Sequence, residues 1–349
     1  MPSLEPDFLE NLRFSKVELS TLKTIGEYRG KQALYTHQTP QVLEALRQVS
    51  AIESTESSNR IEGILAPHLR VEQLVLHFTQ PKNRSEQEIA GYRDALSLIH
   101  ESGKDMPFSK NVILQLHQML YHYSSGRGGH WKMQDNQIVE KNSEGKIHRI
   151  RFSPVPAVST PQAMDDLLGN YKLANQAHQA EPLIFAPLVI LDFLCIHPFA
   201  DGNGRTARLL TLMMLLYQMD IEVGRYISLE RVYEQTKETY YEALEKSSIH
   251  WHESKHDVFP WLNYFWGTLL AAYREFEQRV GVIKKGKGSK TDQVISAVNR
   301  STKPFSIREL ERDCPGVGRD MIRLVLRELR DQGKIKVKGF GVGARWEKI

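Results

Sequence analysis

The chain has 349 residues, 41% of them hydrophobic and 25% charged, and its formal net charge is +4. This is ordinary globular usage, and the length allows more than one core. The two cysteines, Cys195 and Cys314, form no CxxC pair, no apolar run reaches membrane-spanning length, and the acidic N-terminus lacks a signal-peptide core. These features exclude a membrane protein and a disulfide-rich secreted protein, and we expect a cytoplasmic protein without a membrane partner.

The N-terminal part of the chain has the apolar spacing of helices. Residues 40–53, 85–102 and 111–123 each place apolar side chains three and four positions apart, on one helix face. His117 lies in the last of these segments, where we expect a structural rather than a catalytic role. The segment SSNRIEG, taken alone, is typical of a helix end that is capped by Gly63.

The helical spacing ends after residue 123. Residues 124–130 are rich in Gly and Ser and predict a loop. Segments 136–140 and 146–152 have the composition of strands, and residues 141–145 between them carry a turn signal. A β-hairpin is therefore expected, either as a plain surface feature or as part of a functional site.

Residues 197–208, HPFADGNGRTAR, lie between two apolar helical runs at 184–196 and 209–219. A short loop that leads into a helix N-terminus is an anion site. The first backbone N–H groups have no partner within the helix, and the helix dipole favours negative charge. Gly202 and Gly204 allow a tight turn and a close approach to a ligand.

The side chains of this segment suit a polyphosphate. Arg205 and Arg208 lie three positions apart on one helix face, and two guanidinium groups suit a polyphosphate better than a single carboxylate. Asp201 supplies a hard oxygen ligand of the kind that Mg²⁺ accepts beside substrate phosphates. His197 can take up a proton near neutral pH.

The segment that follows contains aromatic and histidine residues. Tyr240 and Tyr241, within 232–244, suit the face of a purine, although core packing alone would also explain them. Three histidines at 250–256 are accompanied by no cysteine, so a solvated loop is expected there rather than a metal site. The aromatic-rich segment 258–276 predicts a helix that closes the core.

Charge divides the chain near residue 281. Residues 284–349 hold 17 Lys and Arg against 8 Asp and Glu, a balance of +9, and the segment before residue 290 is rich in Gly and Lys. Such a composition predicts a flexible linker. We therefore predict an N-terminal helical region at 1–107, a core at 108–280, a linker at 281–289 and a C-terminal domain at 290–349.

The C-terminal domain looks like a winged helix. Helices are expected at 291–299, 306–313 and 319–332, and two strands around a glycine-rich wing are expected at 335–338 and 344–346. A basic stripe lies opposite the apolar face of the last helix and consists of Arg319, Arg323, Arg327 and Arg330. This placement is typical of a DNA-recognition helix, but winged helices also bind proteins, so both partners stay open.

The run HPFADGNGRTAR resembles the signature of the Fic family, His-x-Phe-x-Asp/Glu-Gly-Asn-Gly-Arg-x-x-Arg, with every fixed position filled. The resemblance implies a mainly α fold, with a Fic helical core and a β-hairpin flap, followed here by the winged helix. It implies that His197 is the general base, that Asp201 holds Mg²⁺ and that Arg208 reaches the γ-phosphate of ATP. It also implies a phosphate-binding loop formed by Gly202, Asn203, Gly204 and Arg205.

Ser58 to Gly63 resembles the inhibitory motif of that family, Ser/Thr-x-x-x-Glu-Gly/Asn. The resemblance implies that Glu62 pairs with Arg208 and blocks the γ-phosphate, because a carboxylate and a phosphate compete for one guanidinium. Because the motif precedes the core, this chain resembles the class whose inhibitory helix is N-terminal.

Two other segments carry the resemblance further. The hairpin at 136–152 resembles the flap that docks a target segment by strand addition, although Lys132 stands where arginine is common before the flap. Tyr240 and Tyr241 resemble the segment that lines the adenine pocket.

These observations predict a protein adenylyltransferase that uses ATP and Mg²⁺ and is held in check by Glu62. Its acceptor would be a Ser, Thr or Tyr hydroxyl of a target protein, itself included. The related Doc branch phosphorylates and has lysine where Gly204 stands, which favours nucleotidyl transfer here. A deadenylylase or another nucleotidyl or phosphoryl transferase on the same fold stays open, as does a nucleotide-sensing DNA-binding regulator. The oligomeric state is open too, with a homodimer among the alternatives.

Overall fold

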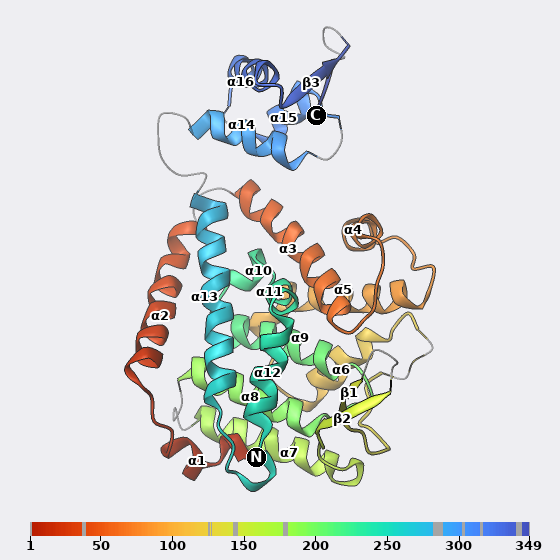
Figure 1. Ribbon diagram of the computed structural model, residues 1–349, viewed down its shortest axis with the longest axis vertical. Helices are drawn as coiled ribbons and strands as arrows, with labels where there is room; N and C mark the ends of the chain where they lie inside the picture. The colour runs from red at the N-terminus through yellow and green to blue at the C-terminus, as the bar shows by residue number, and fades with distance from the viewer. Residues whose placement is uncertain are drawn as a thin grey trace. The chain divides into compact units, whose positions relative to one another are not determined.

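The computed structural model is mainly helical, as the sequence predicts, and the strands among its described residues form two small two-stranded sheets (Figure 1). It describes residues 2–36, 40–124, 126, 128–141, 146–176, 181–281, 289–301, 304–314, 317–339 and 344–348. The chain forms two compact units, Met1–Arg274 and Glu275–Ile349. The predicted linker at 281–289 begins after this boundary, and its residues 282–288 lie outside the described residues.

In the first unit the elements follow in the order η1 (Pro2–Leu4), α1 (Pro6–Glu10), α2 (Lys16–Thr36), α3 (Pro40–Ile61), α4 (His68–His77), α5 (Arg84–Ser102), η2 (Gly103–Asp105), α6 (Lys110–Leu120), β1 (Ile138–Lys141), β2 (Ile147–Phe152), η3 (Ala157–Ser159), α7 (Thr160–Gln176), α8 (Pro182–Ile196), α9 (Asn203–Gln218), α10 (Val223–Tyr226), α11 (Leu229–Gln235), α12 (Lys237–Ser248), η4 (Trp251–Glu253) and α13 (Phe259–Gly281), whose last residues belong to the second unit. The predicted helices and the predicted hairpin are present, with boundaries shifted by a few residues except at α3, α9 and α13, which are longer than predicted. Across the described residues, no helix combines the length and the apolarity needed to cross a bilayer.

Helices α8 and α9 form the centre of the first unit (Figure 1). Helix α8 is apolar on all sides, and almost all of its side chains are buried, as expected of a helix enclosed by others. Helices α7 and α12 pack on α8, while α3, α5 and α6 pack on α9. The loop of residues 197–202 joins these two buried helices, so its position is set by the core.

Helix α3 runs from Pro40 to Ile61, well beyond the predicted 40–53, and it is attached to its neighbours by buried polar contacts. Ser54 Oγ donates to Glu230 Oε2 at 2.7 Å, and Tyr92 Oη donates to Glu230 Oε1 at 2.9 Å. The 3% exposed Glu230 thus joins α3, α5 and α11. At the end of α3, Lys237 Nζ donates to Ile61 O at 2.9 Å. Helix α3 is therefore an integral part of the core.

Strands β1 and β2 form an antiparallel hairpin in which Glu140 pairs with Arg149. Residues 142–145 of its predicted turn lie outside the described residues. Arg149 lies 2.7 Å from Glu140 and 2.7 Å from Glu245 of α12, so one guanidinium joins both strands to the helix. The hairpin consequently lies against the C-terminal half of α12.

The histidine-rich segment at 250–256 differs from the expected solvated loop. His256 is only 5% exposed, and its Nε2 lies 2.8 Å from Ser3 Oγ. Ser3 Oγ also donates to Asp192 Oδ1 of α8 at 2.5 Å, and Trp251 Nε1 donates to the same oxygen at 2.6 Å. The prediction is wrong for His256 because the N-terminal segment, far away in sequence, covers it.

The second unit contains α14 (Ser289–Arg300), α15 (Ile307–Asp313), α16 (Arg319–Asp331), β3 (Ile335–Lys338) and β4 (Arg345–Lys348), close to the predicted segments. Strands β3 and β4 are antiparallel, and Phe305 bridges to Trp346. Ser306 and Glu309 form the predicted capping box of α15. Residues 340–343 of the predicted wing lie outside the described residues.

We predict that His100→Leu weakens the acid sensitivity of folding. His100 is buried on α5, and desolvation lowers its pKa to about 3, helped by the nearby charges of Arg225 and Arg47. Between pH 6.5 and about 3, His100 therefore binds a proton in the unfolded chain but not in the folded chain. The folded state loses stability as the pH is lowered through this range. Removing the ring should reduce the slope of stability against pH by up to one proton, or roughly 1.4 kcal/mol per pH unit.

The measurement is the free energy of unfolding between pH 7 and 5, by denaturant titration with tryptophan fluorescence. His122→Leu, at an exposed position, is the matched control. An unchanged slope in His100→Leu would contradict the prediction.

Candidate active site

A cavity of about 530 Å³ lies between the β1–β2 hairpin, α12 and the loop that joins α8 to α9. This volume is typical of small-molecule sites. The predicted site residues that line it are Glu62, His197, Asp201, Gly204, Arg208, Tyr240 and Tyr241. The fold thus brings the end of α3, the α8–α9 loop and α12 to one place.

His197 ends α8 in the left-handed conformation, with φ 51° and ψ 61°. Its Nδ1 lies 3.3 Å from Leu194 O. Because a carbonyl oxygen can only accept, Nδ1 carries the proton of the neutral ring and Nε2 keeps its lone pair. Desolvation lowers the pKa of His197 to about 4, so the ring is neutral at neutral pH and able to accept a proton.

Asn203 and Asp201 use their side chains to fold the loop. The Phe199 N–H donates to Asn203 Oδ1 at 2.9 Å, and Asn203 Nδ2 donates back to Phe199 O at 2.8 Å. The Gly202 N–H donates to Asp201 Oδ1 at 2.7 Å, and Gly202 itself has φ 79°. Gly202 and Asn203 do not line the cavity. What they can offer a phosphate is backbone N–H groups at the start of α9.

Gly204 lies in the first turn of α9, close to the Glu62 carboxylate. A Cβ atom at Gly204 would overlap with Glu62 Oε1. Glu62 therefore approaches a helix N-terminus, which favours an anion. A side chain at position 204, lysine included, would displace this carboxylate.

Arg208 is held by the end of α3 through three contacts. Its Nη2 donates to Glu62 Oε1 at 2.7 Å and to Ser58 O at 3.0 Å, and its Nε donates to Ser58 Oγ at 2.8 Å. The ion pair predicted between Glu62 and Arg208 is therefore present, and Ser58 supplies two further acceptors. Arg208 is 3% exposed, whereas the Glu62 side chain is 31% exposed.

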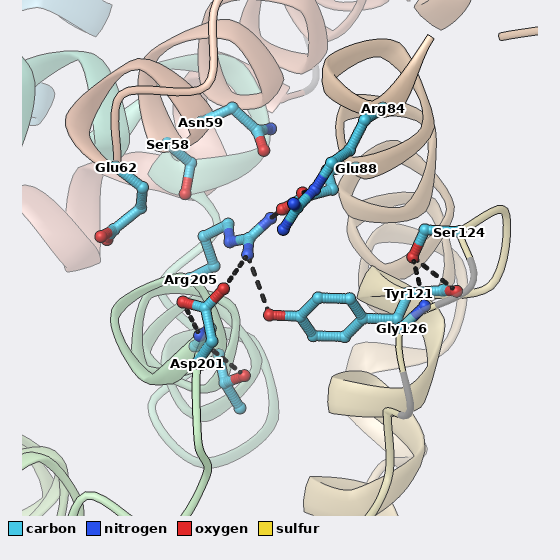
Figure 2. A network of polar contacts seen from close by, with 12 residues as sticks. Ser58, Asn59, Glu62, Arg84, Glu88, Tyr121, Ser124, Gly126, Asp201 and Arg205 are labelled. Atoms are coloured by element: carbon cyan, nitrogen blue, oxygen red, sulfur yellow. Dashed lines mark hydrogen bonds and ion pairs between the residues drawn. The ribbon is translucent and has the colours of Figure 1, made fainter. Parts of the chain in front are cut away.

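Arg205 has other partners than the sequence led us to expect. Figure 2 shows its guanidinium between Glu88, Tyr121 and Asp201. Its Nη1 donates to Glu88 Oε2 at 2.8 Å, its Nη2 donates to Tyr121 Oη at 3.1 Å, and Asp201 Oδ2 lies 3.9 Å away. Arg205 is 1% exposed and does not line the cavity, so this geometry does not support the predicted phosphate contact.

Glu88 is the residue that sequence reasoning missed at this point. It lies on α5 and is 5% exposed. A buried guanidinium needs a carboxylate, and Glu88 supplies it from a segment far away in sequence. The available signal was its position in line with the buried stripe of α5, four residues before Tyr92.

The two tyrosines of α12 differ in their surroundings. Tyr240 is 3% exposed and packs among the rings of Tyr233, Trp261 and Tyr264, so core packing is sufficient to explain an aromatic residue at this position. The Tyr241 ring has Arg151 and Lys237 at 5.8 and 5.9 Å from its centroid. Both tyrosines nevertheless line the cavity, beside the hairpin.

His117 supports the loop from α6. The Gly129 N–H donates to its Nδ1 at 2.9 Å, so its Nε2 carries the proton and donates to Asp201 O at 3.0 Å. Its ring stacks on Phe199 at 3.6 Å between centroids. Burial lowers the pKa of His117 to about 4. These contacts fit the structural role expected for this residue.

The donor set at the cavity fits Mg²⁺ held together with substrate phosphates. The Asp201 side chain is 72% exposed and lines the cavity, so a hard carboxylate oxygen is accessible there. Within the described part of the chain, no group of three or more His, Cys, Asp and Glu could hold a metal by itself. A single carboxylate beside a polyphosphate is the arrangement that Mg²⁺ accepts, so Asp201 would be the protein ligand.

We predict that Glu88→Gln destabilises the fold by about 3–5 kcal/mol, because it leaves the Arg205 guanidinium buried without its counter-charge. Arg84→Ala is the matched control. Arg84 Nε also pairs with Glu88, at 3.1 Å, but its side chain is 83% exposed. Such a surface pair contributes roughly 0–1 kcal/mol. The measurement is the free energy of unfolding by denaturant titration, and equal effects of the two variants would overturn the assignment.

Comparison with known proteins agrees with this geometry. Residues 107–215, from just before α6 into α9, match the Fic/DOC family. A Fic family protein from Desulfovibrio desulfuricans is similar over 97% of both chains, with 20% identity and a TM-score of 0.62. A Fic domain-containing signaling protein from Bacteroides thetaiotaomicron is similar over 75% of this chain and 99% of its own, with 20% identity and a TM-score of 0.61.

Fic-1 from C. elegans is similar over 77% of this chain and 74% of the other, with 16% identity and a TM-score of 0.59. At these identities the solved structures show a shared fold, and the family match shows which segment carries the shared domain. The chain therefore shares its fold with Fic proteins, and residues 107–215 are the segment that matches the Fic/DOC family.

Proposed function

We propose that this protein is an adenylyltransferase, which transfers AMP from ATP to a Ser, Thr or Tyr hydroxyl of a protein and is held inactive by Glu62. The proposal rests on one observation: Glu62 and Ser58 bind the guanidinium group of Arg208, in a cavity that His197 also lines. Fic domain proteins commonly transfer nucleotide or phosphate groups to proteins, and the complete signature resembles the branch that transfers AMP.

The geometry supports a simple reaction. His197, neutral and with its lone pair on Nε2, accepts the proton of the target hydroxyl while the hydroxyl oxygen attacks the α-phosphorus of ATP. The bond between the α-phosphorus and the bridging oxygen breaks, and pyrophosphate leaves. Backbone N–H groups at the start of α9 stabilise the charge on the phosphates. Mg²⁺, when bound beside Asp201, would supply further charge stabilisation.

Two observations favour this function over a phosphoryl transferase and a nucleotide sensor. Gly204 leaves room for the Glu62 carboxylate, whereas the lysine of the phosphorylating branch would displace it. A nucleotide sensor needs no base, yet His197 lines the cavity. A deadenylylase would use Glu62 to position a water molecule, and release of AMP from a modified protein would identify that reaction.

We predict that Glu62→Gly raises self- or target-adenylylation at least about tenfold, because it frees the guanidinium for the γ-phosphate. Labelled ATP incorporated by the full chain is the measurement. His197→Ala in the same background should lower the rate by ~10²–10⁴ while ATP binding persists. An unchanged rate in a folded Glu62→Gly variant would contradict the proposal.

Glu56→Ala is the matched control for this experiment. Glu56 also lies on α3, where it pairs with Arg60 and His68, but it does not line the cavity. Equal activation by Glu56→Ala would mean that loosening α3, rather than removing one carboxylate, relieves the inhibition.

A second function, DNA binding, is proposed for the C-terminal unit as a winged helix. Helix α16 buries Ile322, Val325, Leu326 and Leu329 on one face. Its exposed face carries Arg319, Arg323, Arg327 and Arg330. Local acidic residues partly neutralise this stripe, because Arg323 pairs with Asp320 and Arg330 with Asp331. The overall balance of +9 over residues 284–349 still favours a polyanion.

We predict that the full chain shifts duplex DNA with an affinity that falls steeply with salt, because bound phosphates release counterions. Changing Arg323 and Arg327 to Ala should flatten the salt dependence by about one unit of slope per lost contact. Lys104→Ala with Lys110→Ala, in the first unit, removes the same charge and is the control. No DNA affinity at low salt would leave protein docking as the better account.

A further inference from the structure

Lys132 is a buried lysine in the loop between α6 and β1. Lys132 is only 4% exposed, and its ammonium group donates to Ile196 O at 3.2 Å and to Asn136 Oδ1 at 2.9 Å. Its backbone N–H donates to Pro198 O at 2.8 Å. One residue therefore binds the carbonyl groups immediately before and immediately after His197.

His197 needs such support because its backbone is in the left-handed region, with φ 51°. A residue other than glycine in this region stores about 1–3 kcal/mol of strain and stays there only when its surroundings hold it. The Ile196 carbonyl is also one of the last carbonyls of α8, and these carbonyls receive no hydrogen bond from an N–H group of the same helix. The Lys132 ammonium satisfies this group.

A second contact continues the support along the loop. Asn136 accepts from Lys132 through Oδ1 and donates through Nδ2 to Phe199 O at 3.1 Å. Lys132 and Asn136 together hold the carbonyl groups of residues 196, 198 and 199. Neither residue lines the 530 Å³ cavity, so their hydrogen bonds support the site through this backbone.

Charge distinguishes Lys132 from a neutral hydrogen-bond donor. The charged groups that act on His197 are Lys132, which lowers its pKa, and Glu62 and Asp201, which raise it; the largest effect is desolvation. Desolvation lowers the pKa of Lys132 itself to about 8, partly offset by Asp135, so the ammonium still predominates at neutral pH. The two carboxylates favour the protonated imidazole, and the positive charge of Lys132 counteracts this effect.

We propose that Lys132 is a positioning residue for His197: it holds the backbone on both sides of the histidine and places a positive charge beside it. The role of His197 as base rests on the proposed adenylyltransferase function, whereas the support by Lys132 does not.

The test compares Lys132→Met, Lys132→Arg and Asn136→Ala in the Glu62→Gly background, with Lys110→Met as the control. Lys110 is an exposed lysine at the start of α6. The first measurement is the NMR titration of the His197 ring, assigned by its loss in His197→Ala. We expect Lys132→Met to raise the midpoint by about one pH unit, and Lys132→Arg and Lys110→Met to leave it unchanged.

The second measurement is the steady-state rate with labelled ATP. Lys132→Met should lower kcat about 10–100-fold, because a small displacement of the base is costly, and should change KM for ATP less than about twofold. Lys132→Arg should restore most of kcat. Asn136→Ala should lower kcat while the His197 midpoint stays low, which separates support of the loop from the effect of charge.

An unchanged His197 midpoint and an unchanged kcat in Lys132→Met would overturn the proposal. A loss of ATP affinity equal to the loss of kcat would also overturn it, because it would indicate general damage to the site. If the Glu62→Gly parent transfers no AMP, the adenylyltransferase function fails, and the titration alone then decides the role of Lys132.

Discussion

Two buried guanidinium groups on one turn of α9 constrain the whole site. Arg205 and Arg208 are both less than 4% exposed, and a buried charge is tolerated only when a counter-charge and hydrogen bonds accompany it. Glu88 of α5 supplies the counter-charge for Arg205, and Glu62, just after α3, supplies it for Arg208. The positions of α3 and α5 against α9 are therefore tied to the signature itself.

The two pairs are matched to different tasks. The Arg205–Glu88 pair is enclosed, with both side chains at most 6% exposed, and it faces away from the cavity. An ion pair enclosed in this way is typical of a contact that stabilises the fold. In the other pair, the Glu62 side chain is 31% exposed and lines the cavity, so an incoming phosphate could take its place without unfolding α3. Helix α3 would stay attached through Glu230 and through Lys237 at its end.

The loop between α8 and α9 is held from several sides, which explains how a strained histidine is kept in place. Asn203 closes the loop on Phe199, His117 binds Asp201 O from α6, and Lys132 binds both neighbours of His197. Pre-organisation of this kind is what the proposed role of His197 as a base requires, because the geometry of a base must be set before the substrate arrives. The rigid part of the site is thus the α8–α9 loop, while the hairpin and Glu62 border its open side.

The sequence alone determined the helical class, most helix positions and the identity of the signature, because periodicity and short motifs are local properties. It also indicated that Glu62 and Arg208 would meet, through resemblance rather than through spacing. Only the tertiary structure decided that Arg205 faces Glu88 instead of the cavity and that the Asn203 side chain is used within the loop. It also decided that His256 is covered by Ser3 and that Lys132 spans His197. Each of these depends on which buried polar group finds a partner, and that partner comes from a distant segment whose approach no local pattern encodes.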